Sequence, residues 1–129
     1  PALSDEDVNS LLSIFKDILG DRVSDVKITD RLINSVARLV DAEGSLGQEM
    51  QRVYRMMDKD YKIPTKVLEI NPDHPILKKI SQLADDDHRR ELIVEQVFES
   101  TLLIEGLHPD PASMIPRIQK LMESALEGE

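Results

Sequence analysis

The side chains of this 129-residue chain best suited to bind a metal ion or move a proton are three histidines and one run of acids. His74 lies in "NPDHP", residues 71–75, and His88 ends "DDDH", residues 85–88. No second His or Cys stands near His74 at the spacing of a zinc site. A loop for a hard cation would alternate its oxygen ligands and include a glycine, which "DDDH" does not do. We therefore expect no metal, cofactor or catalytic residue, and interpret "DDDH" as a solvated loop that caps the next helix.

The composition argues against several other classes of function. Hydrophobic residues make up 40% and charged residues 32% of the chain, as in a soluble, helix-rich domain. The net charge of −9 argues against nucleic acid, because phosphate binding needs clustered lysine and arginine. Without cysteine there is no disulfide, and no apolar run approaches the roughly 20 residues that cross a bilayer. No secretory leader is visible, we expect no membrane partner, and a start at Pro1 suggests a processed chain or a piece of a longer one.

Hydrophobic periodicity predicts a small sheet combined with helices. Apolar residues recur from Val8 to Leu19, which predicts a helix capped by Ser4 and ended by Gly20. Stretches rich in β-branched residues predict strands at 22–29, 35–43 and 66–70, with Gly44 ending the second. The fold class is therefore α+β or α/β, with a three-stranded sheet layer in a single domain, 1–129.

Two helices, at about 88–107 and 110–126, follow the mixed part of the domain at 1–87. Only a short loop joins them, so they should form an antiparallel hairpin. Pro116 falls inside the second helix, which either begins regularly near Ser113 or kinks.

The "NPDHP" segment connects the third strand to a short helix. Either Asn71 or Asp73 is expected to accept hydrogen bonds from the free amides at the helix start, and the spacing does not decide between them. A proline in the first turn removes only an amide that has no partner. His74 is most simply a residue of this first turn.

The helix at 88–107 carries more apolar surface than its partner in the hairpin covers. At about 100° per residue its apolar side chains occupy most of the circumference, and its glutamates occupy a narrower arc. These apolar residues are Leu92, Ile93, Val94, Val97, Phe98, Leu102, Leu103, Ile104 and Leu107. A helix that is apolar on several sides must be covered on several sides. Either the small sheet covers the remainder or a second chain does, and the pattern favours neither.

A second unusual helix runs from Leu46 to about Met57 and carries Met50 and Met56 beside Val53 and Tyr54. Methionine is flexible and polarizable, so such a face suits a surface that adapts to many partners. Packing of this face on the sheet is the alternative. The polar stretch at 55–66, with a proline at 64, is expected to be a mobile connection.

Three segments resemble the C-terminal part of the heat-shock protein 90 chaperone family. They are "VLEINPDHPILKKI" at 67–80, "LLIEGLHPDPASMIPRIQKLM" at 102–122 and "FKDILGDRVSDVKITDRLINSVARLV" at 15–40. Together they span most of the chain, and the Asn-Pro-Asp-His-Pro run in this context is far more specific than a lone short motif.

The resemblance implies a constitutive dimerisation domain, in which the last two helices of each copy pair into a four-helix bundle. Interface residues carried over by position are Phe98, Leu102, Leu103, Met114, Ile115, Ile118, Leu121 and Met122. The resemblance also implies contact with unfolded client proteins through the methionine-bearing helix. The residues carried over there are Met50, Val53, Tyr54 and Met57.

The resemblance further implies a parent protein with ATP and magnesium sites in domains that this chain does not include. The ending "SALEGE" lacks the acidic pentapeptide of cytosolic eukaryotic members, which favours a bacterial or organellar member, most simply of the bacterial cytoplasm. We expect a homodimerisation module of an ATP-dependent heat-shock chaperone that assists protein folding under stress. The alternative is a free-standing dimeric adaptor or regulator. An enzyme ranks third, because no nucleophile is paired with a base.

Overall fold

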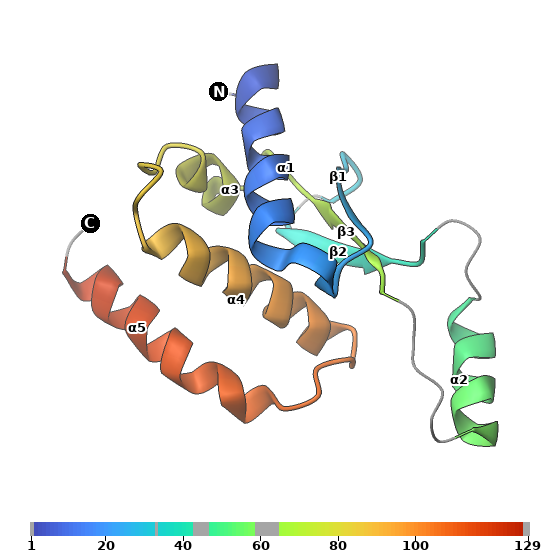
Figure 1. Cartoon of the computed structure of the whole chain (residues 1–129). Coiled ribbons are helices and arrows are strands. Elements are labelled where there is room, and N and C mark those ends of the chain that lie inside the picture. Colours follow the sequence, from blue (N-terminus) through green and yellow to red (C-terminus); the bar gives the residue numbers. More distant parts are fainter. Residues whose placement is uncertain (1, 33, 43–46, 59–64, 128–129) are drawn as a thin grey trace.

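The computed structural model describes residues 2–32, 34–42, 47–58 and 65–127, which form a small sheet and helices (Figure 1). In chain order the elements are α1 (Asp5–Leu19), the 3₁₀ turn η1 (Gly20–Arg22), β1 (Asp25–Ile28), β2 (Ala37–Val40), α2 (Gln48–Met57), β3 (Val67–Ile70), α3 (Pro75–Ile80), α4 (Arg89–Ile104), the 3₁₀ turn η2 (Pro111–Met114) and α5 (Ile115–Leu126). The mixed class and the three predicted strands are confirmed, although each strand is shorter than predicted. Gly44 and Leu46, where a strand end and a helix start were predicted, lie outside the described residues, as does Pro64.

The sheet has the strand order β1-β3-β2, with β3 parallel to β1 and antiparallel to β2. In this register Val26, Leu68 and Leu39 lie side by side on one face. The opposite face carries a row of charged residues, in which Arg38 Nε donates to Glu69 Oε1 over 2.6 Å. Such alternation gives a sheet with one apolar and one polar face.

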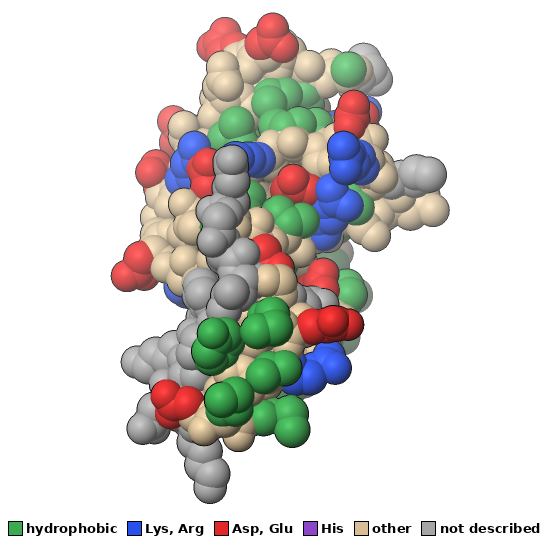
Figure 2. All heavy atoms as spheres, turned by 90° about the vertical axis from the view of Figure 1, so that its right-hand side faces the viewer, with side chains coloured by type: hydrophobic (Ala, Val, Ile, Leu, Met, Phe, Trp, Pro, Cys, Tyr) green, Lys and Arg blue, Asp and Glu red, His purple; other side chains and the backbone are tan. Residues whose placement is uncertain are grey.

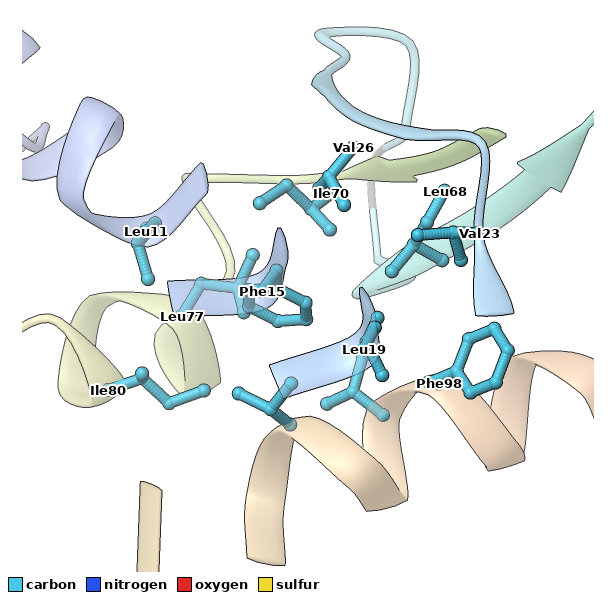
Figure 3. Packing of buried hydrophobic residues seen from close by; sticks show 12 residues of the cluster. Leu11, Phe15, Leu19, Val23, Val26, Leu68, Ile70, Leu77, Ile80 and Phe98 are labelled. Atoms are coloured by element: carbon cyan, nitrogen blue, oxygen red, sulfur yellow. The ribbon is translucent and has the colours of Figure 1, made fainter. Parts of the chain in front are cut away.

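The core fills the space between the apolar face of the sheet and helices α1, α3 and α4 (Figure 3). Phe15 of α1 lies at its centre and is fully buried, together with Leu68 of β3 and Leu77 of α3. The predicted cap of α1 is confirmed, because Ser4 Oγ accepts a hydrogen bond from the Asp7 amide at 3.1 Å. Helix α4 closes the core with Val94 and two further side chains.

The "NPDHP" segment starts α3 in a way that differs from the prediction. His74 is the cap: its Nδ1 accepts a hydrogen bond from the Ile76 amide at 3.1 Å, and Pro75 occupies the first turn. The prediction that Asn71 or Asp73 caps this helix is wrong. Asn71 is buried and serves another purpose, because its Oδ1 accepts from the Asp73 amide and its Nδ2 donates to the Ser35 carbonyl at 3.2 Å.

The N-cap residue of α4 is His88, which makes no side-chain capping hydrogen bond, and the acidic run before it satisfies one free amide of the helix. Asp87 Oδ1 accepts a hydrogen bond from the Arg89 amide at 3.0 Å, and the same carboxylate forms an ion pair with the Arg89 guanidinium. The pKa of Asp87 is lowered to about 2, mainly by the hydrogen bond from the Arg89 side chain and next by the hydrogen bond from the Arg89 amide.

The connection between α4 and α5 decides between the two predicted alternatives for Pro116. The 3₁₀ turn η2 comes first and regular helix begins at Ile115, so the later start, near Ser113, is confirmed. Pro116 therefore lies in the first turn of α5, where it removes no helical hydrogen bond. Ser113 does not cap α5, since its hydroxyl donates to the Asp110 carbonyl at 2.6 Å.

Gly106 ends α4 with a left-handed backbone, at a φ of 73°. The Leu107 amide donates to the Leu102 carbonyl at 2.8 Å, and the Gly106 amide donates to the Leu103 carbonyl at 3.1 Å. This pair of hydrogen bonds is the Schellman motif, which satisfies the last free carbonyls of a helix.

Replacing Gly106 by alanine should lower the free energy of unfolding by roughly 1–2 kcal/mol, because a Cβ is unfavourable in this backbone conformation. No atom lies within 4 Å of the position of the added Cβ, so the cost is one of backbone conformation and not of collision. Gly106→Asn should lose less, since asparagine tolerates this conformation. Urea unfolding at fixed protein concentration measures both, and equal stability of Gly106→Ala and wild type would contradict the assignment.

Candidate interaction surfaces

Helices α4 and α5 present an apolar surface that no described residue covers. One side of α4 is buried against the core through Val94, Val97 and Phe98. At the C-terminal end of α4, Ile104 is 81% exposed, and at the end of α5 Leu126 is 87% exposed. No residue of α5 is buried, although this helix packs along α4. The hairpin therefore has apolar side chains both on the core side and on the solvent side.

The predicted interface residues divide into three groups by exposure. Phe98 and Met114 are buried within the chain itself, at 5% exposure each. Leu102, Ile118 and Leu121 are half-buried, and Leu103, Ile115 and Met122 are exposed. Their role at an interface stays a prediction.

Two of the most exposed apolar side chains of this surface were not in the predicted set. Ile104 and Leu126 end α4 and α5, respectively. Both could have been found from the sequence: Ile104 belongs to the apolar arc of its helix, and Leu126 lies four residues after Met122, hence on the same side.

A cluster of polar side chains fixes the position of α5 on α4. The Glu99 carboxylate lies 2.7 Å from Nε2 of His108 and 2.5 Å from the Arg117 guanidinium, which also donates to Gln96 at 3.1 Å. His108 Nδ1 accepts a hydrogen bond from the Asp110 amide at 3.0 Å, which places the ring proton on Nε2, facing Glu99. The cluster thus joins α4, the loop and α5 through one carboxylate.

Glu99 is charged although it lies in a largely buried position. Burial opposes its ionisation, but the hydrogen bonds from His108 and Arg117 outweigh burial and lower the pKa of Glu99 below its usual 4.5. Sequence reasoning missed this cluster, because residues at positions 99, 108 and 117 have no recognisable spacing and meet only when the loop folds back.

Helix α2 has its polar side toward the rest of the chain. Gln51 is buried, at 3% exposure, and its Nε2 donates to Asp41 Oδ1 at 3.2 Å. Lys66, also buried, forms an ion pair with the same carboxylate. The hydrogen bond from Lys66, against the opposing effect of burial, lowers the pKa of Asp41. This contact ties α2 to the segments that follow β2 and precede β3.

The apolar side of α2 points away from the sheet. Met50, Val53, Tyr54 and Met57 are all exposed, and Figure 2 shows hydrophobic side chains gathered on this helix. The alternative that these residues pack on the sheet is therefore wrong. Met56 is more exposed still, at 81%. An amphipathic helix normally turns its apolar face toward the core, and α2 does the reverse.

The described residues hold no group of three or more His, Cys, Asp or Glu that could bind a metal ion. Within the same part of the chain, no helix is both long and apolar enough to cross a membrane. His74 caps α3 and His108 contacts Glu99, so each has a structural partner.

Comparison with known proteins gives consistent matches along the chain. Residues 3–129 match the family model described as Hsp90 protein. The chain is 43% identical over 121 residues to the chaperone protein HtpG of Oleidesulfovibrio alaskensis, covering 92% of the chain and 19% of that relative. It is 35% identical over 130 residues to HtpG of Nitratidesulfovibrio vulgaris, covering 97% of the chain and 20% of that relative. It is 36% identical over 130 residues to HtpG of Chlorobaculum tepidum, covering 95% of the chain and 20% of that relative. The chain thus spans about a fifth of the length of these curated relatives.

The Glu99 cluster should make stability depend on pH in the acid range. Because the pKa of Glu99 is lowered by folding, its contribution is complete above the usual value of 4.5 and is lost as the pH falls through the folded value. Other carboxylates with lowered pKa, such as Asp41 and Asp87, share this range, so the comparison is with Glu99→Gln. The variant should be less stable at pH 7 and lose less stability between pH 7 and acid pH, as measured by urea unfolding. Parallel pH curves for the two proteins would rule out this role.

Proposed function

Since the chain belongs to the Hsp90 protein family, we propose that it is the C-terminal dimerisation domain of an HtpG-type molecular chaperone of the bacterial cytoplasm. Two copies associate through α4 and α5, which pair into a four-helix bundle. The domain itself carries no catalytic residue or cofactor, and ATP with magnesium is used by other domains of the parent protein. The segments "NPDHP" and "GLHPDP" support this position in the family by their resemblance.

The observation that carries the proposal is the uncovered apolar surface of α4 and α5. Ile104, Ile115, Met122 and Leu126 are exposed on these two helices. Full burial of an aliphatic side chain of this size contributes about 1.5–3 kcal/mol. Four such side chains amount to a free energy comparable with the whole stability of a domain, about 5–15 kcal/mol. A second copy that covers them gains part of this energy, since Ile115 and Met122 are already about half covered in the single chain.

Dimerisation has a direct mechanical consequence for the parent chaperone. It holds two ATP-binding regions on one assembly, so that their contact becomes an intramolecular event at high effective concentration. Unfolded client proteins bind weakly to the outward face of α2. Met50 and Met57 adapt their rotamers to different apolar segments, and Tyr54 adds a rigid aromatic surface.

Met122→Asp should convert the dimer into a monomer that remains folded. Met122 is exposed on α5 of the single chain, so the carboxylate is solvated in the monomer and buried only at the proposed interface. Because a two-fold interface contains the residue twice, we expect the dissociation constant to rise by about a hundredfold or more. Sedimentation equilibrium measures the change, with far-ultraviolet circular dichroism as the test of folding.

Lys120→Asp is the matched control for that variant, because it places the same charge on the polar side of α5 and should leave the dimer intact. A wild-type chain that sediments as a monomer at micromolar concentration would overturn the proposal.

The double substitution Met50→Ser and Tyr54→Ser should weaken client binding without dissociating the dimer. Fluorescence anisotropy with a labelled, permanently unfolded protein, reduced carboxymethylated α-lactalbumin, measures the affinity. Arg52→Ser, on the side of α2 that faces the C-terminal end of α4, is the control. We expect a loss of about tenfold for the double variant and little change for the control. If the double variant binds as tightly as wild type, α2 has no role in client contact.

A further inference from the structure

All the sulfur atoms of this chain belong to methionine, because the sequence has five methionines and no cysteine. Three of them, Met50, Met56 and Met57, lie on the ten-residue helix α2. Met56 is 81%, Met57 77% and Met50 46% exposed. The hydrophobic side chains of this helix gather on the outer surface of the molecule (Figure 2). The two most exposed methionines therefore lie on the surface that is proposed above to bind clients.

The other two methionines are less accessible to a dissolved oxidant in the proposed dimer. Met114, in the turn η2, is 5% exposed, and its sulfur accepts a hydrogen bond from Gln96 Nε2 at 3.6 Å. An oxidant reaches such a sulfur only when the surrounding structure opens locally. Met122 is 59% exposed in the single chain, but it lies on the surface of α5 that a second copy is proposed to cover. The methionines that stay open to solvent in the dimer are then those of α2.

We propose that Met50, Met56 and Met57 form a site of reversible oxidation, at which conversion to methionine sulfoxide switches off client binding by α2. The oxidant is a hydroperoxide. A lone pair of the sulfur attacks the outer peroxide oxygen, so that an S–O bond forms while the O–O bond breaks. The departing oxygen takes the proton of the transferred one and leaves as water or an alcohol, so the sulfur loses two electrons and the peroxide gains them. This inference rests on the client binding proposed above and adds its regulation.

The oxidation of methionine can be reversed by thiols. Two thiols, such as those of a methionine sulfoxide reductase, return the two electrons: they become a disulfide, and the oxygen leaves as water. The 129 residues contain no cysteine that a peroxide could oxidise instead. Sulfur chemistry in this chain is thus confined to a side chain whose first oxidation product can be repaired.

Oxidation changes what the surface of α2 offers to a client. A thioether is apolar and adapts its shape, whereas a sulfoxide is polar and accepts hydrogen bonds. An apolar client segment cannot satisfy that acceptor, so burial of the sulfoxide beneath the segment is unfavourable. Met56 takes part because, at about 100° per residue, it lies only about 60° around the helix from Val53. Of the proposed contact residues, Val53 and Tyr54 alone then keep their apolar character.

The fold should tolerate the change. Met56 and Met57 are turned to solvent, so a sulfoxide at either position stays hydrated. Helix α2 is attached by its opposite side, where the buried Gln51 donates to Asp41 Oδ1 at 3.2 Å. The core cluster between the sheet and helices α1, α3 and α4 contains no methionine among the described residues. Oxidation therefore alters the binding surface and spares the core.

Oxidation with hydrogen peroxide, followed by mass spectrometry of peptides, tests the selectivity of the site. In the folded chain Met56 and Met57 should react about tenfold faster than Met114, because the buried sulfur reacts only during local opening. In urea all five methionines should react at similar rates, which assigns the order of reaction to the fold. Oxidation of Met114 as fast as that of Met57 in the folded chain would contradict the site.

The effect on binding is measured by fluorescence anisotropy with carboxymethylated α-lactalbumin, which is added after the chain has been oxidised and the peroxide removed. We expect the dissociation constant to rise by about tenfold on oxidation and to return after treatment with a methionine sulfoxide reductase and dithiothreitol.

The matched control is the triple variant Met50→Leu, Met56→Leu and Met57→Leu, which keeps apolar side chains of similar volume but cannot form a sulfoxide on α2. Its affinity before peroxide is compared with its own affinity after peroxide, and the two should agree. Met122→Leu removes a sulfur outside α2, and this variant should still respond to peroxide as wild type does.

The results separate this inference from the client binding on which it rests. If the unoxidised chain binds the client, and the chain with three sulfoxides on α2 binds it equally tightly, α2 contacts clients but is not a switch. If the triple leucine variant loses affinity in peroxide as wild type does, the effect arises elsewhere and the inference is overturned. If the unoxidised chain does not bind the client, both proposals fail.

Discussion

The structure depends on a single helix, α4, which has to pack against other elements on two sides. Its inner side closes the core of a sheet that has only one apolar face, and its outer side carries the hairpin partner α5. A sheet of three strands cannot cover a helix that is apolar around most of its circumference. The chain therefore buries Val94 and Phe98 and leaves Ile104 in solvent. The exposed apolar surface follows from this geometry and not from an unusual excess of apolar residues.

A helix face that is exposed to solvent cannot hold its helix in place by apolar packing. Here clusters of polar side chains fix the helices instead. Glu99 joins α4 to α5 through His108 and Arg117. Asp41 joins Gln51 of α2 to Lys66 beside the sheet. Both clusters centre on one carboxylate that is kept charged by its partners, as the lowered pKa of each shows. Charged hydrogen bonds of this kind impose a specific direction, so each helix is fixed with its apolar side outward.

Local sequence patterns predicted the structural features that depend on residues close together in the chain. The Ser4 cap, the three strands and the helical hairpin are such features, and all are confirmed. The cap of α3 was wrongly assigned because Asn71 donates hydrogen bonds to the carbonyls of Leu32, Ser35 and Val36, which are distant in sequence. The parallel pairing of β1 with β3, and the meeting of Glu99 with Arg117, likewise depend on how distant segments fold together. No spacing in the sequence encodes these contacts.

The exposed apolar surface of α3, α4 and α5 and that of α2 differ in the side chains that they present to a partner. The surface of α3, α4 and α5 carries isoleucine and leucine side chains. It lies beside residues 34–37, which a hydrogen bond from Asn71 to the Ser35 carbonyl holds in place. β-Branched and leucine side chains have few rotamers, so they suit one complementary partner held for long times. On α2, methionines surround a tyrosine on a helix held to the rest of the chain by a few polar side chains. Methionine adapts its shape at little energetic cost, which suits weak contact with many sequences. The side chains of the two surfaces thus differ as the proposed division between a permanent partner and transient ones requires.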